Sequence, residues 1–118
     1  MGTFRLEATV SNPRDPARSV TLPLLVDTGA TYTTLPREVG EALGLEPIDT
    51  RRVRVADGRE ERWPIAPVLI RVDGGEGPSL ALIGRAGGPA LLGAVTLEEL
   101  ALGVDPSAQR LIPTTSLA

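Results

Sequence analysis

Apolar and polar residues alternate along much of the chain with a period of two, which is the pattern of β-strands with one buried face. The first such run covers residues 4–10, and an apolar run over residues 20–26 follows turn formers that begin at Asn12 and Pro13. We expect these two runs to form an antiparallel hairpin. Further strands are predicted at residues 33–35, 51–56, 59–65, 68–72, 80–83, 91–93 and 110–112.

Two short helices are predicted between the strands. Pro36 suits the first turn of the first helix, and Gly44 is a suitable residue to end it. The second helix is expected to begin with Thr96 as its N-cap, with Glu99 completing a capping box, and to stop at Gly103. The sequence therefore predicts a single mainly β domain over residues 1–118 with short connections.

The loops between the strands contain two Asp-Gly pairs. Asp57-Gly58 separates two predicted strands and is a strong signal for a short hairpin turn, whereas Asp73 opens a glycine-rich loop over residues 73–78. The first hairpin is either a flap over a cleft or an ordinary surface hairpin, because such turns are common in β domains. The sequence alone leaves both interpretations open.

The composition removes several kinds of chemistry. The chain has no cysteine and no histidine, and all 12 of its basic residues are arginine. Cysteine nucleophiles, serine-histidine or serine-lysine pairs, lysine Schiff bases, Walker A loops and zinc sites built on Cys or His are therefore excluded. No calcium-loop motif is present, so we expect no metal and no cofactor. Carboxylates are the leading candidates for acid-base groups.

Charge and hydropathy limit the expected partners and location. With 15 acidic residues against 12 basic ones, the chain lacks the excess of positive charge that nucleic-acid binding needs. No apolar run approaches the length that spans a bilayer. The chain has no cysteine, so there is no disulfide framework that would suggest export. We expect a cytoplasmic protein without nucleic-acid or membrane partners.

A candidate catalytic acid stands where an apolar strand ends in a turn. Residues 24–26 are apolar, and Asp27, Thr28 and Gly29 follow them. The strand would hold the carboxylate rigidly, the Thr28 hydroxyl would maintain its geometry, and Gly29 would let the backbone approach closely. Hydrolysis of a peptide bond by carboxylates needs two acids, one to activate water and one to polarise the carbonyl. The alternative interpretation of Asp27 is an ordinary turn former.

The flanks of this tripeptide carry a resemblance to a known family. Ala30 follows it, a short strand leads to Leu35, and the apolar-apolar-Gly motif Leu91-Leu92-Gly93 later leads into a helix. From Phe4 to Pro113 the chain resembles the retropepsin-like aspartic proteases, particularly their bacterial and archaeal single-domain members. The resemblance implies a retropepsin-like closed β domain that forms a symmetric homodimer.

The resemblance also implies roles for individual residues. Asp27, Thr28 and Gly29 would be catalytic, and the flap would lie around Asp57 and Gly58. The substrate-binding residues would be Ala30, Thr31, Asp57 and Gly58. Viral members of the family carry two further acids where this chain has Thr31 and Tyr32, so their ion-pair network at the dimer interface is not expected here.

The predicted function is that of an aspartic endopeptidase acting on peptides or unfolded proteins. Because the chain has a single Asp-Thr-Gly, the second acid must be Asp27 of a second copy, and we expect the terminal strands to pair across the two chains. Two alternatives stay open: a non-catalytic dimeric module that binds peptides or proteins, and a purely structural β domain.

Other prominent residues are given structural interpretations. Arg51, Arg52 and Arg54 alternate with valines and are expected to form a solvated strand face. Trp63, the only tryptophan, either lines a substrate pocket or packs in the interior. The interior is favoured, because large aromatic side chains are usually mostly buried.

Overall fold

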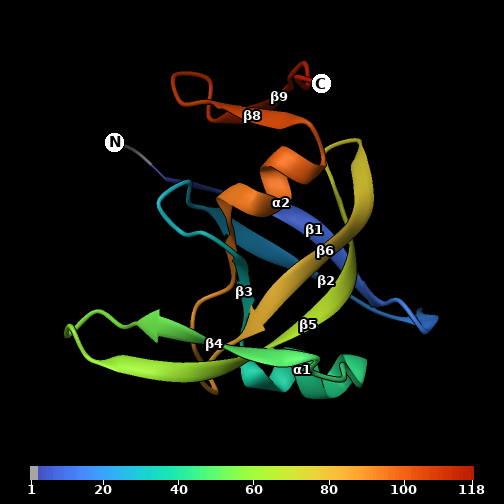
Figure 1. Ribbon diagram of the computed structural model, residues 1–118. Coiled ribbons are helices and arrows are strands. Elements are labelled where there is room, and N and C mark those ends of the chain that lie inside the picture. The colour runs from blue at the N-terminus through green and yellow to red at the C-terminus, as the bar shows by residue number, and fades with distance from the viewer. Residues whose placement is uncertain (1–2) are drawn as a thin grey trace.

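The computed structural model describes residues 3–118, which form nine strands and two short helices (Figure 1). The mainly β class predicted from the sequence is confirmed. The helices are α1 (Arg37–Leu43) and α2 (Ala94–Glu99). The strands are β1 (Phe4–Asn12), β2 (Asp15–Val26), β3 (Thr33–Leu35), β4 (Asp49–Arg54), β5 (Glu60–Val72), β6 (Gly75–Ile83), β7 (Leu91–Leu92), β8 (Leu102–Asp105) and β9 (Arg110–Pro113).

Seven of the strands form one sheet that closes on itself. The strand order is β1-β2-β7-β3-β6-β5-β4, and β1 also pairs with β5. The six strands from β1 to β5 in this order therefore make a closed ring, and β4 is attached to it through β5. From Ala8 to Ser11, β1 pairs with β2 on one side and β5 on the other. This part of the first strand has no free edge, so the expectation that residues 4–10 pair with a second chain is wrong for residues 8–10.

The interior of the ring is filled by aliphatic side chains from every side. Val10, Leu24, Leu35, Ile70 and Leu92 come from different strands, and each is at most 1% exposed. Burial of one such side chain stabilises the fold by about 1.5–3 kcal/mol. The core therefore fixes the strand ends that carry the candidate site.

The strand β5 is longer than the sequence pattern indicated. It replaces the two strands predicted at residues 59–65 and 68–72 and continues through Pro64 and Pro67. Its first half pairs with β4 and its second half with β6 and β1, so the prolines lie where the strand changes partners. A proline is tolerated there because its fixed φ is compatible with extended backbone and only its missing N–H is a cost.

The two Asp-Gly pairs make different turns: the short hairpin turn predicted at Asp57 and Gly58 is confirmed, but the loop predicted at residues 73–78 is not found. Asp73 and Gly74 have φ of 46° and 84° and form a two-residue turn from β5 to β6, so no loop extends to residue 78. Asp57 and Gly58 belong to a three-residue turn, in which the Gly58 amide donates to the Val55 carbonyl at 2.9 Å and Gly58 has a φ of 89°. Positive φ is the conformation that favours glycine at both second positions.

The helix α1 has the predicted C-terminal residue, but α2 differs from its prediction. Gly44 ends α1 with a left-handed φ of 66°. Gly93, not Thr96, is the N-cap of α2, the helix ends at Glu99, and Gly103 lies in β8. Thr96 makes no cap because its side chain is fully buried and bonds to other hydroxyl groups.

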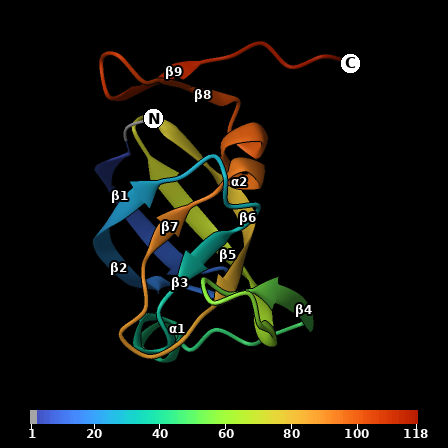
Figure 2. The same cartoon turned by 90° about the vertical axis from the view of Figure 1, so that its left-hand side faces the viewer.

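The strands β8 and β9 form a separate two-stranded sheet at one end of the molecule, beyond α2 (Figures 1 and 2). Leu111 of β9 reaches the core and is 6% exposed, whereas Ile112 is 36% exposed. Neither helix within residues 3–118 is long and apolar enough to cross a membrane.

Shortening a core side chain should destabilise the closed sheet. We expect Leu24→Ala to lower the free energy of unfolding by about 2–5 kcal/mol, because the buried site cannot collapse around the lost atoms. Urea unfolding of the purified protein measures the change. The matched control is Leu117→Ala, since Leu117 is 99% exposed. Equal destabilisation by both substitutions would contradict this description of the core.

Candidate active site

Asp27 is the first residue after β2 and is held at the strand end by the backbone. Val26, which precedes it, is 4% exposed and anchors the strand in the core. The Asp27 amide donates to the Leu92 carbonyl of β7 at 3.0 Å, which extends the parallel pairing of β2 with β7. The carboxyl group therefore projects from a rigid strand end, as the apolar run before it predicted.

Residues 27–32, the Asp27 loop, begin with a tight turn. One carboxylate oxygen of Asp27 accepts the Gly29 amide at 3.0 Å, and the Ala30 amide donates to the Asp27 carbonyl at 3.1 Å. A Cβ atom on Gly29 would lie 3.2 Å from that carboxylate oxygen, which is tighter than ordinary contact. A glycine here lets the amide reach the acid without crowding it.

The far side of the Asp27 loop is fastened to the start of α2. The Ala94 amide donates to the Ala30 carbonyl at 2.8 Å, and the Val95 amide donates to the Thr31 carbonyl at 2.9 Å. These helix amides have no partner inside the helix, so the loop carbonyls satisfy them. The loop and α2 thereby form one rigid unit.

Gly93 explains why the apolar-apolar-Gly motif lies beside this loop. A Cβ atom on Gly93 would lie only 2.4 Å from the Tyr32 carbonyl carbon and 2.8 Å from the Thr33 nitrogen. Backbone atoms cannot yield at such distances, so no other residue fits without moving the loop. The Gly93 amide also donates to the Thr33 hydroxyl at 3.2 Å.

The outer side of the Asp27 loop is open. Thr28, Gly29 and Thr31 are exposed, while Asp27 and Ala30 are half-buried. Within residues 3–118 the Thr28 hydroxyl makes no hydrogen bond. Inside one chain it therefore has no partner through which it could play its predicted role of maintaining the geometry of Asp27. The hydroxyl is free to bond to a group from another molecule.

The β4–β5 hairpin projects from the same side of the molecule as the Asp27 loop (Figures 1 and 2). At its tip, the Asp57 carboxylate accepts the Arg59 amide at 3.0 Å and pairs with the Arg59 guanidinium at 2.7 Å. Among the described residues, these bonds and the bond of the Gly58 amide to Val55 all join residues of the hairpin to one another. The structure does not bring Asp57 and Gly58 into contact with Asp27.

One strand of this hairpin contacts the Asp27 loop directly. The Arg51 guanidinium lies 6.0 Å from the centre of the Tyr32 ring, and its Nε donates to the Tyr32 hydroxyl at 3.5 Å. Arg51 also pairs with Asp49 at 3.0 Å. The predicted solvated face therefore holds for Arg52 and Arg54, which are exposed, but Arg51 is half-buried against the loop.

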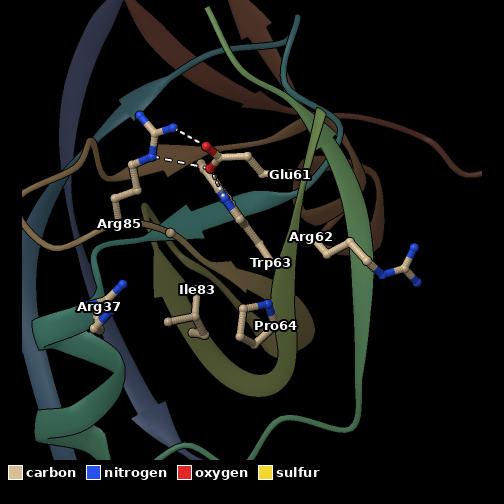
Figure 3. Close-up of a pocket in the computed structure, with 8 residues that line it drawn as sticks. Arg37, Glu61, Arg62, Trp63, Pro64, Ile83 and Arg85 are labelled. Atoms are coloured by element: carbon tan, nitrogen blue, oxygen red, sulfur yellow. Dashed lines mark hydrogen bonds and ion pairs between the residues drawn. The ribbon is translucent and has the colours of Figure 1, made fainter. Parts of the chain in front are cut away.

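The other strand of the hairpin is bound to residues 84–90, the connection between β6 and β7. In Figure 3, Arg85 and Trp63 both direct side-chain nitrogens at Glu61. Arg85 donates through Nε at 3.3 Å and also through Nη2, and the Trp63 indole donates at 2.9 Å. These residues border a hollow of about 580 Å³, which Asp27 does not line. Trp63 is half-buried and lines this hollow, so it lies outside the core position that the sequence favoured over a pocket.

The charge of Glu61 is stabilised by these partners. The Arg85 guanidinium, and after it the Trp63 indole, hold the pKa of the Glu61 carboxyl below its ordinary value. A lowered pKa keeps the carboxylate ionised until the pH falls through that lowered value. The contact between the hairpin and the 84–90 connection therefore persists into mildly acidic solution.

The residues that bind the hairpin to its surroundings could not be found from the sequence. Glu61 and Arg85 are 24 positions apart, and Tyr32 and Arg51 are 19 apart. Neither pair shares an element, so no local spacing could reveal it. Residues 3–118 contain no group of three or more carboxylates placed to hold a metal ion.

The fold is shared with proteins of known structure. No curated protein sequence matches the chain. The solution structure of the simian foamy virus (mac) protease matches with a TM-score of 0.58 and 23% identity, over 82% of this chain and 94% of that one. The EIAV protease complexed with the inhibitor HBY-793 matches with a TM-score of 0.63 and 20% identity, over 84% and 88%.

The sequence itself matches the family model of the aspartyl proteases over residues 7–105. This match spans most of the chain and includes Asp27, its loop and the Gly93 motif. The chain therefore belongs to the aspartyl protease family, and its fold is retropepsin-like.

Proposed function

We propose that this protein is an aspartic endopeptidase in which two chains pair and each contributes Asp27 to one active site. The observation that carries the proposal is the setting of Asp27. Its carboxylate projects from a strand end in the core, accepts the Gly29 amide at 3.0 Å, and lies in a loop fastened to α2. A rigidly held acid beside an open surface is what this chemistry requires.

The need for a second chain follows from the number of acids. Asp27 is in the only Asp-Thr-Gly of the sequence, while Asp57 and Asp73 lie in hairpin turns. A two-fold axis beside the Asp27 loop would bring two identical carboxylates together, because an isologous interface places equivalent residues at the axis. The exposed Thr28 hydroxyl, which has no partner within residues 3–118, would then bond across the axis.

The proposed reaction divides the two acids between two roles. Two carboxyl groups in hydrogen-bonding contact share one proton, since like charges so close cannot both ionise. The ionised Asp27 takes a proton from a water molecule, whose oxygen attacks the carbonyl carbon of the peptide bond. The protonated Asp27 donates to the carbonyl oxygen. Transfer of a proton to the amide nitrogen then breaks the C–N bond and releases an acid and an amine.

The substrate proposed for this site is an extended peptide segment or an unfolded protein. The β4–β5 hairpin would act as the flap, with Asp57 and Gly58 at its tip above the peptide. Ala30 and Thr31 follow the acid and would contact the peptide backbone. An extended chain presents alternate side chains to opposite sides, where pockets of the site can bind them. We expect these pockets to prefer apolar residues around the cut.

Removing the carboxylate should abolish cleavage. We expect Asp27→Asn to lower the rate of peptide hydrolysis by at least about a hundredfold, because neither proton transfer is then possible. Cleavage of an unstructured peptide library, followed by mass spectrometry, measures the loss. The control is Asp73→Asn in the β5–β6 turn, where asparagine tolerates the positive φ. A variant at residue 27 that cleaves like the wild type would refute the mechanism, and peptide binding without cleavage by the wild type would favour a binding module.

The pH-rate profile should peak below neutral pH. The active form holds one shared proton on the pair, so activity is expected to fall when both acids are protonated and again when both are ionised. The measurement is the cleavage rate of one peptide from acid to alkaline pH, repeated with a chelator. The chelator should leave the rate unchanged. A maximum at clearly alkaline pH, or inhibition by the chelator, would contradict the proposal.

A further inference from the structure

Behind the Asp27 loop, four polar side chains make one continuous series of hydrogen bonds. The hydroxyl oxygens of Thr33 and Thr96 are 2.6 Å apart, and those of Thr96 and Ser79 are 2.8 Å apart. Ser79 donates to the Glu99 carboxylate at 2.6 Å. Thr33 and Thr96 are fully buried and Ser79 is 5% exposed, while Glu99 lies on the exposed side of α2. The series thus runs from the surface to the loop.

Only one arrangement of protons satisfies every bond in this series. An ionised carboxylate can only accept, so Ser79 must use its single proton on Glu99. Thr96 must then donate to Ser79, and Thr33 must donate to Thr96. The Thr33 oxygen is left to accept the Gly93 amide, which lies 3.2 Å away and can only donate. Glu99 therefore fixes the direction of every bond back to Gly93.

The Gly93 amide, which bonds to Thr33 directly after the Asp27 loop, is the first of three successive amides that bond to residues 30–33. The next two, from Ala94 and Val95, donate to the carbonyls of Ala30 and Thr31. A change in the position of Gly93 would therefore move the segment that carries Asp27. Bonds in such a buried series also strengthen one another, which makes the arrangement stiff.

We infer that Glu99 is a positioning residue, which acts through Ser79, Thr96 and Thr33 to fix the Asp27 loop against Gly93. The inference deepens the proposed protease function and rests on it for the task of the loop. A substitution that breaks the series should lower kcat while KM changes little, because the reacting acid is displaced although the peptide-binding surface is kept. A network that serves only stability would change the melting temperature without changing kcat.

The test uses two pairs of variants in the full chain. Thr96→Val removes one hydroxyl and keeps the shape, whereas Thr96→Ser keeps the hydroxyl. Glu99→Leu removes the terminal acceptor, whereas Glu99→Gln retains an oxygen that can accept from Ser79. The exposed neighbour Glu98 supplies the matched control, Glu98→Leu. For each variant, kcat, KM and the hydrogen-exchange rate of the Gly93 amide are measured, the last by NMR.

We expect Thr96→Val to lower kcat about ten- to a hundredfold with KM within about twofold, and to speed exchange at Gly93. Glu99→Leu should act in the same direction but less strongly, because water can reach Ser79 in place of the carboxylate. Thr96→Ser and Glu99→Gln should keep most of the wild-type kcat and most of the wild-type protection of the Gly93 amide from exchange. If Thr96→Val fails to fold, the surface pair at residue 99 decides the question.

The inference is overturned if Glu99→Leu and Glu98→Leu give the same kcat and the same Gly93 exchange. It is also overturned if Thr96→Val folds with kcat and exchange unchanged. The exchange measurement needs no catalysis, so it separates this inference from the proposed function. A wild type that cleaves nothing, with faster Gly93 exchange in Glu99→Leu alone, would refute the protease and retain the positioning role.

Discussion

The close approach of Gly93 to the backbone of Tyr32 and Thr33 is the constraint on which the site depends. A Cβ atom at Gly93 would lie 2.4 Å from the Tyr32 carbonyl carbon, so only a glycine permits this contact. Because the two backbones touch, the Leu92 carbonyl can accept the Asp27 amide, and the first amides of α2 can donate to the loop carbonyls. The closed sheet contributes by holding β7 between β2 and β3. The position of the acid is therefore set by backbone packing and hydrogen bonds and not by its own side-chain contacts alone.

The parts of this arrangement that follow local rules could be predicted from the sequence. The apolar run before Asp27, the glycine in its turn and the apolar-apolar-Gly motif each have a local physical cause, and the structure places them side by side. Thr96 and Glu99 also fitted a local rule, the capping box, yet the tertiary packing of Thr96 against Thr33 and Ser79 prevailed. The helix starts at Ala94 instead, and its first amides bond to carbonyls of the Asp27 loop, so Thr96 is not needed as a cap.

The remaining differences arise from partners that are distant in the sequence. The two Asp-Gly pairs look alike, but the register of the flanking strands makes a two-residue turn at Asp73 and a three-residue turn at Asp57. The hairpin that bears Asp57 is bound at its base by Arg51 to Tyr32 and by Glu61 to Arg85. Among the described residues, the tip of the hairpin beyond these contacts makes no hydrogen bond or ion pair with the rest of the chain. These pairings depend on the folded topology, and no spacing in the sequence encodes them.

The central claim is that one chain holds half of an active site, and mixing two kinds of chain tests it most directly. Wild-type and Asp27→Asn chains are equilibrated in equal amounts, with subunit exchange verified, and the activity is compared with that of wild-type protein at the same total concentration. If each active site needs Asp27 from both chains, random pairing leaves about one quarter of the dimers with two acids, and the activity falls to about one quarter. An activity of about one half would mean that each chain works by itself and would contradict the account.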